Sequence, residues 1–309
     1  MFRFSFEKVC FMNHFLYQSI AASSGLCYNK NGFPFSTKEG IHPMSQFLYE
    51  THMHTSQASA CGKSPGRDYI QRYIDAGYAG IIITDHFFRG NCGVDPTLPW
   101  KERVRRFCSG FEDAREEGEK RRFPVFFGWE ERYDGDEFLI YGLDQAWMLE
   151  HPEMERWTRG EQFEQVHSAG GCVVQAHPFR ERSYIHTIHL STGCVDAVEG
   201  VNSDNSAECN GMGLRYAALL GLPVTAGSDN HCAETMKPEL LSGVVFDHPL
   251  TDVHDYVRAI RQKEPFQIHG GPRMEWNETI QPHTPVEFRG PDDRVFSSDL
   301  LRFMKTGAF

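Results

Sequence analysis

The chain has 309 residues, which is enough for one large α/β barrel or two medium domains, and 40% of them are hydrophobic. Its formal net charge of −11 argues against a broad nucleic-acid-binding surface, because phosphate backbones require clustered Lys and Arg. No apolar run reaches the roughly 18 residues of a membrane-spanning helix. We expect a globular protein with a sizeable core and no membrane partner. The negative charge does not exclude a small phosphorylated substrate, since bound divalent cations can invert the local field.

The nine cysteines point to a reducing environment. Their number is odd and no Cys-x-x-Cys motif occurs, so the sequence predicts neither a thiolate zinc site nor a disulfide framework. Free thiols are typical of the cytoplasm, which is the location we expect.

Residues 1–43 carry no pattern that indicates a chemical function. Asn13, His14 and Gln18 interrupt the apolar stretch that a secretory signal would need. We expect an N-terminal extension over residues 1–43, either disordered or not part of the natural protein. A catalytic barrel over residues 44–270 follows, and residues 271–309 form a tail that packs on the barrel or extends from it.

Strand-like and helix-like segments alternate through the expected barrel. Strands are predicted at 47–53, 80–84, 124–128, 172–176, 197–201, 223–226, 243–246 and 265–268, with 137–143 as a hairpin partner or neighbour of the third. Helices are predicted at 64–77, 100–122, 159–169, 207–220 and 253–263. Alternating strands and helices build a parallel barrel, whose chemistry lies at the carboxyl ends of the strands.

Five short motifs rich in metal ligands follow five of these strands. They are His52-Met53-His54, Thr84-Asp85-His86, Gly128-Trp129-Glu130, Ala176-His177-Pro178 and Gly227-Ser228-Asp229-Asn230-His231. Each motif alone is more simply a hydrogen-bonded histidine or a cap. Five motifs in register with five strands favour a metal centre, since imidazole and carboxylate groups at one barrel mouth suit zinc, manganese or iron.

Local geometry strengthens this interpretation. Side chains alternate along a strand, so the two imidazoles of His52 and His54 should lie on one face and bind the same ion. The two oxygens of Glu130 could bridge two ions, as carboxylates do in two-metal hydrolases. His177 precedes a proline, which predicts an extended backbone at that residue.

In combination, these motifs resemble the PHP family, named for the polymerase and histidinol phosphatase domain, over residues 47 to about 268. The resemblance implies a distorted (β/α)7 barrel that holds two or three divalent ions and hydrolyses phosphate esters. It implies a first ion held by His52, His54, Glu130 and Asp229, a second held by Glu130 and His177, and a third held by His86 and His231.

The chain departs from the family's pattern at two positions. Many members have Asp, His or Glu a few residues after the first motif, where this chain has Gln57, a weaker ligand for the third ion. Many also have a histidine after the Glu motif, where Glu137 stands as a candidate substitute. We therefore expect two divalent ions (zinc, manganese or iron) and leave a third open.

The expected reaction is hydrolysis of a phosphate ester by a hydroxide that bridges two ions. The candidate catalytic residues are Glu130, Asp85 and His86, the last two for proton transfer or ligand orientation. The candidate phosphate-binding cations are Arg132, Arg180 and Lys63. The substrate would be a small phosphorylated metabolite, a nucleotide or a short oligonucleotide. Two alternatives are a metal hydrolase of an amide or lactone, and a metal-binding domain without catalysis.

Overall fold

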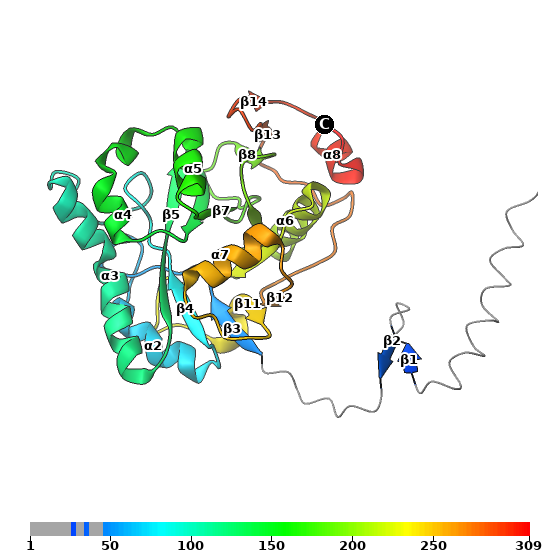
Figure 1. The fold of residues 1–309 in the computed structure, drawn as a ribbon. Helices are drawn as coiled ribbons and strands as arrows, with labels where there is room; N and C mark the ends of the chain where they lie inside the picture. The colour runs from blue at the N-terminus through cyan, green and yellow to red at the C-terminus, as the bar shows by residue number, and fades with distance from the viewer. Residues whose placement is uncertain (1–25, 29–33, 37–45) are drawn as a thin grey trace, which may run out of the picture. The chain divides into compact units, whose positions relative to one another are not determined.

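The structure is a computed structural model that describes residues 26–28, 34–36 and 46–309. Two short strands, β1 (Leu26–Tyr28) and β2 (Pro34–Ser36), pair antiparallel with each other. The remainder of the predicted extension over residues 1–43 lies outside the described residues. Residues 46–309 form a second unit, which contains all the predicted ligands (Figure 1).

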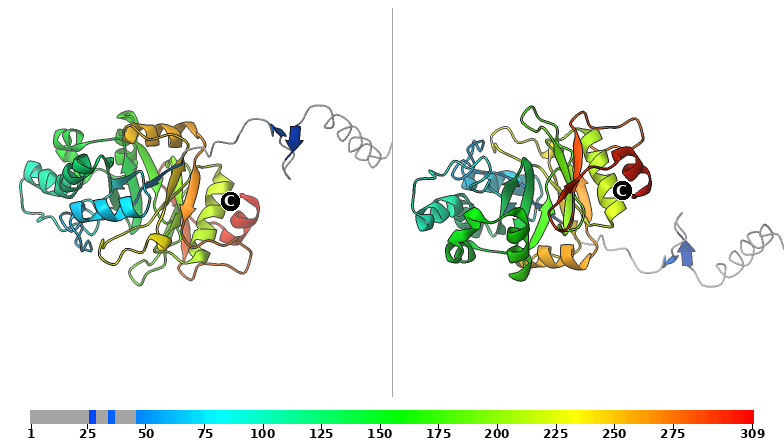
Figure 2. Two further views of the ribbon diagram at one scale, coloured as in Figure 1. Left: turned by 90° about the horizontal axis from the view of Figure 1, so that it is seen from below. Right: turned by 90° about the horizontal axis from the view of Figure 1, so that it is seen from above.

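A nine-stranded sheet curls into a nearly closed barrel at the centre of this unit (Figures 1 and 2). Its strands, in spatial order, are β10 (Val224–Gly227), β9 (Ala197–Asn202), β7 (Cys172–Gln175), β6 (Asp136–Tyr141), β5 (Val125–Tyr133), β4 (Gly80–Ile83), β3 (Phe47–Glu50), β11 (Ser242–Phe246) and β12 (Gln267–Gly270). The predicted α/β barrel is confirmed, although β6 and β11 run antiparallel to both of their neighbours.

Two hydrogen bonds join the loop after β3 to the loop after the edge strand β10. The backbone N–H of Asp229 donates to the carbonyl of His52 at 2.7 Å, and that of His54 donates to the carbonyl of Asn230 at 2.9 Å. The loops that follow β3 and β10 therefore lie together, although they are far apart in the sequence.

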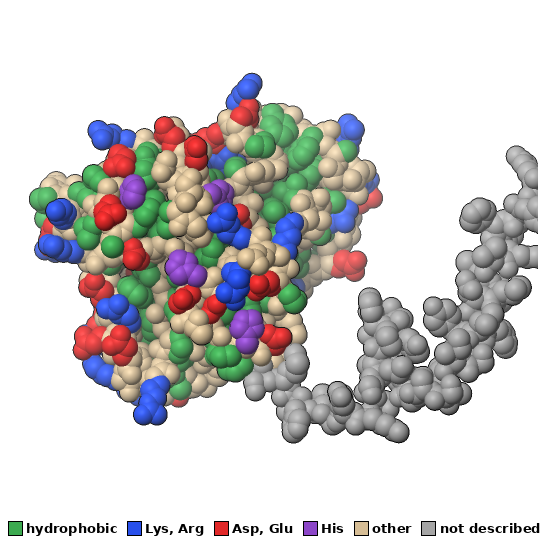
Figure 3. Space-filling view, viewed as in Figure 1, with side chains coloured by type: hydrophobic (Ala, Val, Ile, Leu, Met, Phe, Trp, Pro, Cys, Tyr) green, Lys and Arg blue, Asp and Glu red, His purple; other side chains and the backbone are tan. Residues whose placement is uncertain are grey.

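Helices pack around the sheet (Figures 1 and 2). They are α2 (Gly66–Asp75), α3 (Trp100–Arg121), α4 (Gln145–Glu150), α5 (Arg159–Ser168), α6 (Ala207–Leu220), α7 (Val253–Gln262) and α8 (Leu300–Thr306), with short 3-10 helices η2 (Pro152–Arg156) and η3 (Pro238–Leu240). None of these described helices has the length and apolar character needed to span a membrane. On the face seen in Figure 3, acidic and basic side chains are interspersed.

Burial explains why the barrel strands read as continuous apolar runs. Every residue of β4 and of β7 is buried, as expected for strands covered on both faces. Ile82, for example, is fully buried, and burying such a side chain stabilises the fold by about 1.5–3 kcal/mol. The same packing fixes the strand ends that carry the ligand motifs.

The third predicted strand is longer than expected. We predicted that it ends at Gly128, but β5 continues to Tyr133 and pairs with β6 in a hairpin. The turn consists of Asp134 and Gly135, with φ values of 52° and 96°, which suits the two-residue turns that match strand twist. Glu130 consequently lies within a strand and not after one.

A small three-stranded sheet was not predicted. It consists of β8 (Ile188–Ser191), β13 (Val286–Arg289) and β14 (Val295–Phe296), in the order β14-β13-β8. The segment after Gly270 thus pairs with β8, and its helix α8 packs against α6. β8 has only four residues and its partner comes from the far end of the chain, so no local pattern indicated it.

Candidate metal centre

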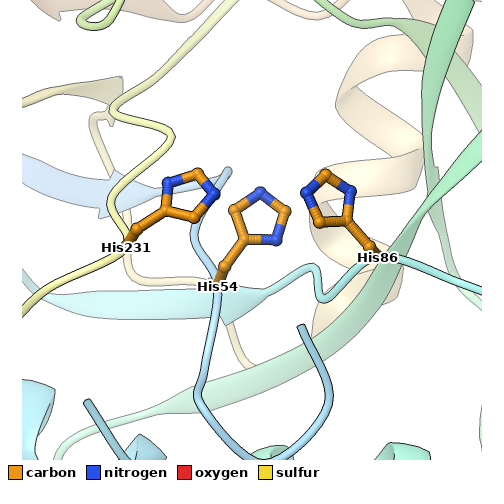
Figure 4. A group of neighbouring side chains, drawn as sticks. All are labelled: His54, His86 and His231. Carbon is orange, nitrogen blue, oxygen red and sulfur yellow. The ribbon is translucent and has the colours of Figure 1, made fainter. Parts of the chain in front are cut away.

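The structure brings all the predicted metal ligands together at one barrel mouth. Their ligand atoms form overlapping groups, each within 4.8 Å: His52/His54/Glu130, His52/His177/Asp229, His86/Glu130/Glu137 and His54/His86/His231. Figure 4 shows the rings of the last group turned toward one another. The overlap arises because the parallel strands end at the same edge of the sheet.

Four of these residues form what we call the inner group: His52, His54, Glu130 and Asp229. They are 0%, 0%, 1% and 5% exposed. Nε2 of His54 lies 3.2 Å from Nε2 of His52, 3.4 Å from Oε2 of Glu130 and 3.0 Å from Oδ1 of Asp229. Nε2 of His52 lies 3.4 Å from Oε1 of Glu130. Two imidazole nitrogens and two carboxylates therefore face a common point.

Hydrogen bonds at the far side of each ring set its tautomer. Nδ1 of His52 lies 2.9 Å from Oε1 of Glu199, and a carboxylate only accepts, so this nitrogen carries the proton. Ser59 Oγ donates to Asp85 at 2.7 Å and must therefore accept from Nδ1 of His54, 3.2 Å away. In the neutral rings, both Nε2 lone pairs point at each other, an arrangement that needs a proton or a cation between them.

Electrostatics place that proton on His52. Burial opposes its charge, but Glu199, Asp229 and Glu130 raise the pKa of His52 well above its usual value. Burial and the neighbouring His86 lower the pKa of His54 well below its usual value. A metal ion bound by both rings must displace the shared proton, so protons and metal compete here.

A second pair of atoms also fits a cation. Oε2 of Glu130 and Nδ1 of His86 lie 2.7 Å apart, yet neither makes a well-oriented hydrogen bond to any residue that the structure describes. Buried polar atoms are rarely left in this state. A divalent ion would satisfy both, and imidazole with carboxylate suits zinc, manganese or iron. The donor set therefore fits the predicted metals.

Glu137 stands where a substitute ligand was expected. Nε2 of His177 lies 3.2 Å from Oε1 of Glu130 and 3.7 Å from Oε2 of Glu137. Burial and the charge of Glu130 raise the pKa of Glu137. A cation shared by Glu137 and Glu130 would offset the repulsion between their two carboxylates.

The expectation of an extended backbone at His177 is wrong. Its φ is 28°, because its N–H donates to Glu199 at 3.2 Å and its carbonyl accepts from the N–H of Arg180 at 2.9 Å. Asp229 also has a positive φ, of 54°. Such conformations cost on the order of 1–3 kcal/mol each and persist only where the surroundings enforce them. Both residues supply ligand atoms to the site.

The side chain of Gln57 does not serve as a ligand for the third ion that the resemblance implies. Its amide donates to Asp113 at 2.9 Å and accepts from the N–H of Gly66 at 3.1 Å, which ties the loop to α2 and α3. Cys61, from the same loop, lines a cavity with His86 and His231, and these three residues are the outer group. Burial raises the pKa of the Cys61 thiol, but the nearby His231 and His86 lower it to about 6.

Asp85 supports the ligands from behind. One oxygen accepts from the N–H of Thr55 at 2.6 Å and from Ser59 at 2.7 Å, and the other accepts from the Thr55 hydroxyl at 2.7 Å. Burial raises the pKa of Asp85 to about 6. Of its two predicted roles, ligand orientation matches these contacts, because Ser59 in turn holds His54.

Two buried carboxylates near the ligands were missed by sequence reasoning. Glu199 of β9 contacts Nδ1 of His52, the N–H of His177 at 3.2 Å and the amide of Asn202 at 3.0 Å. Oε1 of Glu50 accepts three backbone N–H groups, from Thr51, His52 and Ser228, at 3.0, 3.0 and 2.8 Å. The available signal was an acidic residue inside an otherwise apolar strand, since such residues are rarely buried without a partner.

The predicted phosphate-binding cations lie in different places. Arg132 and Arg180 line the same cavity of about 500 Å³ as the outer group, whereas Lys63 is not among the described residues that line it. Arg180 is buried, with Nη1 2.5 Å from Oδ2 of Asp229 and further bonds to Asn202 and Asn205. Arg132 lies over the ring of Tyr184, 5.6 Å from its centroid. Arg132 is therefore the freer of the two.

No family model and no curated protein sequence matches this chain. Its fold is similar to that of a two-domain protein from Bacteroides vulgatus that contains a predicted PHP-like metal-dependent phosphoesterase. The TM-score is 0.55 at 15% identity, over 76% of this chain and 68% of that chain. A weaker likeness, with a TM-score of 0.43 at 18% identity, covers 69% of this chain and 94% of an assumed metal-dependent phosphoesterase from Bifidobacterium adolescentis. The chain thus has the fold of the PHP-like phosphoesterases, as its motifs predicted.

Proposed function

We propose that this chain is a metal-dependent phosphoesterase that hydrolyses a small phosphorylated metabolite, a nucleotide or a short oligonucleotide. The observation that carries the proposal is the buried inner group, which opens through the outer group onto a cavity lined by Arg132, Arg180 and Arg182. The PHP-like fold supports it. We place the reaction in the cytoplasm, where thiols such as Cys61 stay reduced.

Glu130 has the geometry of a bridging ligand. Its Oε1 lies 3.4 Å from Nε2 of His52 and 3.2 Å from Nε2 of His177. Its Oε2 lies 3.4 Å from Nε2 of His54 and 2.7 Å from Nδ1 of His86. Two divalent ions held by these residues would supply a water activated at neutral pH and positive charge for the phosphoryl oxygens. Zinc, manganese and iron all suit this ligand set.

The chain's own residues hold the site and orient the substrate. Arg180 neutralises Asp229 from the side opposite the histidines, which keeps that carboxylate ionised; the arginine and His52 lower its pKa against the effect of burial. Arg132 faces the cavity without an acidic partner among the described residues, so its guanidinium is open to a phosphate. Arg182 pairs with Asp204 at 2.7 Å and forms part of the same wall.

The alternatives are less well supported by these contacts. An amide or lactone hydrolase would use the same inner group but would have no need of Arg132 at the cavity wall, a cation without an acidic partner among the described residues. A metal site that serves structure alone is normally closed, whereas this one borders a cavity of about 500 Å³. Arg180 and Arg182 are paired with Asp229 and Asp204, so Arg132 is the cation of this cavity that favours an anionic substrate.

Metal content and turnover would test the proposal. We expect the protein to bind divalent metal and to hydrolyse a generic phosphomonoester or phosphodiester, and Glu130→Gln to lose nearly all turnover. Glu164→Gln, an exposed change on α5, is the matched control and should behave as wild type. Equal rates in wild type and Glu130→Gln would contradict the proposal. Turnover of an amide or lactone, without turnover of any phosphate ester, would favour the amide or lactone hydrolase instead.

A further inference from the structure

Two cavities meet at the candidate metal centre. The cavity of about 500 Å³ beside Arg132 is called the arginine cavity. A second cavity, of about 390 Å³, is lined by the segment that leads through η3 to β11, including Met236 and Leu240, and is called the η3 cavity. Asp229 of the inner group and His231 of the outer group line both cavities. The predicted ligands therefore border open space on two sides.

Each cavity presents one exposed apolar side chain. Tyr184 in the arginine cavity is 51% exposed and Leu240 in the η3 cavity is 59% exposed. They are the two most exposed large apolar side chains among the described residues. Small-molecule sites typically combine such apolar contacts with a few polar groups that fix the orientation of the ligand. An organic group could therefore be held on either side of the ligands.

The segment that forms the η3 cavity holds Leu240 in its exposed position. The neighbouring Leu241 is 5% exposed and packs in the core, and the N–H of Leu240 donates to the carbonyl of Lys237 at 2.9 Å. Near the start of the segment, the N–H of Ala233 donates to Oγ of Ser64 at 2.9 Å. Both ends are thus anchored, so the exposure of Leu240 is a feature of the fold.

The side chains of the arginine cavity suit one negative charge better than two. Arg180 is paired with Asp229 at 2.5 Å, and Arg182 is paired with Asp204 at 2.7 Å. Arg132 has no acidic partner among the described residues. A phosphodiester carries a single negative charge at neutral pH, whereas a phosphomonoester carries about 1.5 to 2. The charge of this cavity therefore favours a diester.

We propose that the substrate is a phosphodiester that places one organic substituent in the arginine cavity and the other in the η3 cavity. A monoester has one substituent and would leave one cavity empty. Among the substrates proposed above, the inference selects diesters, such as a short oligonucleotide, over a metabolite with a single phosphate ester bond. It rests on the proposed function, because it assumes that phosphate esters are hydrolysed at these ligands.

The bond changes are those of a simple hydrolysis. The oxygen of a water molecule forms a bond to phosphorus, and one of the two ester P–O bonds breaks. One proton of the water goes to the departing oxygen, and the other remains on the phosphate. The products are an alcohol and a phosphomonoester, so no oxidant, reductant or further reactant is needed.

Three synthetic substrates with the same leaving group test the inference on the metal-loaded full chain. They are p-nitrophenyl phosphate, methyl p-nitrophenyl phosphate and bis(p-nitrophenyl) phosphate, which carry no second substituent, a small one and a large one. We expect kcat/KM to be higher for the bis ester than for the monoester by about tenfold or more, since a filled apolar pocket supplies that much discrimination.

Alanine variants of the two exposed apolar residues show whether both cavities are used. In the methyl ester, the leaving group fills one cavity and leaves the other nearly empty. Leu240→Ala or Tyr184→Ala, whichever lies in the cavity of the second substituent, should lower the ratio of kcat/KM for the bis ester to that for the methyl ester roughly fivefold. The other variant should lower both values alike. This ratio does not depend on how much of the enzyme is folded.

Conservative variants and an unrelated site serve as controls. Leu240→Met and Tyr184→Phe keep the apolar groups and should keep the wild-type ratio. Val295→Ala removes apolar atoms from a residue that is 42% exposed and lines neither cavity, so it should also behave as wild type.

The outcomes separate this inference from the proposed function. A kcat/KM for the monoester that equals or exceeds that for the bis ester would overturn the inference and leave the proposed function in place. The same holds for a ratio that neither alanine variant changes, or that Val295→Ala lowers equally. Turnover of none of the three substrates would contradict the proposed function itself, and the inference with it.

Discussion

The inner and outer groups lie side by side but are held in different ways. The side chains of the inner group are almost fully buried, whereas the side chain of His231 in the outer group is 30% exposed. Behind the inner histidines stand Glu199 and the pair of Ser59 and Asp85, which bond to the ring nitrogens that face away from the site. For His231, the partner in that role among the described residues is a backbone carbonyl, that of Asp229.

This difference indicates how each group should behave. Ligands whose far sides are fixed by hydrogen bonds are already oriented for an ion, so they lose little entropy on binding. The outer group borders the cavity and depends on a loop, so its ion should exchange more readily. We therefore expect chelators to remove metal from the outer group first, and the variants below test whether the inner group is the more important of the two.

Asp229→Asn should have the largest effect. Asparagine keeps the size of the side chain and tolerates the φ of 54°. It lacks the negative charge that attracts an ion and that pairs with Arg180 in the wild type. We expect the inner ion to be lost and turnover to fall about a thousandfold, on the order of 4 kcal/mol. Metal content after gel filtration and steady-state kinetics would check this, with the exposed Asp75→Asn as the control. Unchanged metal content would mean that the inner group does not need Asp229 to hold its ion, and the proposed difference between the inner and outer groups would then be wrong.

Glu50→Gln tests the support beneath the inner group. Burial raises the pKa of Glu50 from 4.5 to about 7, so the folded state favours its protonated form. Its contribution to stability is therefore present below pH 4.5 and is lost as the pH rises through 7, by about 3 kcal/mol. Glutamine keeps an acceptor for the three backbone N–H groups and cannot ionise.

Urea unfolding at pH 5 and pH 8, with chelator present, would measure this effect. Wild type should lose about 3 kcal/mol more of its free energy of unfolding between these values than Glu50→Gln does. Parallel pH dependences for the two proteins would mean that Glu50 is ionised in the folded state at low pH, and the buried carboxyl would then need another partner.

Glu199→Gln should weaken metal binding without unfolding the barrel. The carboxylate fixes the proton of His52 on Nδ1 and accepts from the N–H of His177, so it orients ligands of both predicted ions. Losing such a partner typically costs tenfold to a hundredfold in metal affinity. Competition with a chromophoric chelator would measure it, against the exposed control Glu208→Gln. An equal loss of affinity in both variants would argue that charge alone, not orientation, is responsible.

The sequence predicted the parts of the site that follow from strand periodicity. His52, Glu130 and Asp229 each follow or lie in an apolar strand, and parallel strands bring their ends together, so their convergence could be inferred without coordinates. The hairpin at Asp134 and Gly135 also left a turn signal, although it did not reveal that Glu130 lies inside β5.

The missed residues depend on contacts that no local pattern records. Glu199 meets His52 across 147 positions of sequence, and although an acidic residue in an apolar strand signals a buried partner, it does not say which residue that partner is. The direction in which Gln57 points could not be read from the sequence for another reason, and Cys61 shares that difficulty. Both belong to one irregular loop, and only its hydrogen bonds to Asn91 and His231 decide which side chain faces the cavity.

Arg132→Ala should have the smallest effect, because Arg132 touches neither ligand group. Its side chain lies over Tyr184 at the cavity wall, and a phosphate would meet it in partly solvated surroundings. Losing one such charged contact corresponds to about 1 kcal/mol, or roughly a fivefold rise in KM with kcat little changed. Arg132→Lys should recover part of the loss, since lysine keeps the charge without the planar fork. Kinetics with a phosphomonoester would show this while metal content stays at the wild-type value. A fall in metal content would instead place Arg132 among the residues that maintain the ligands, and the cavity wall could then no longer be separated from the metal centre.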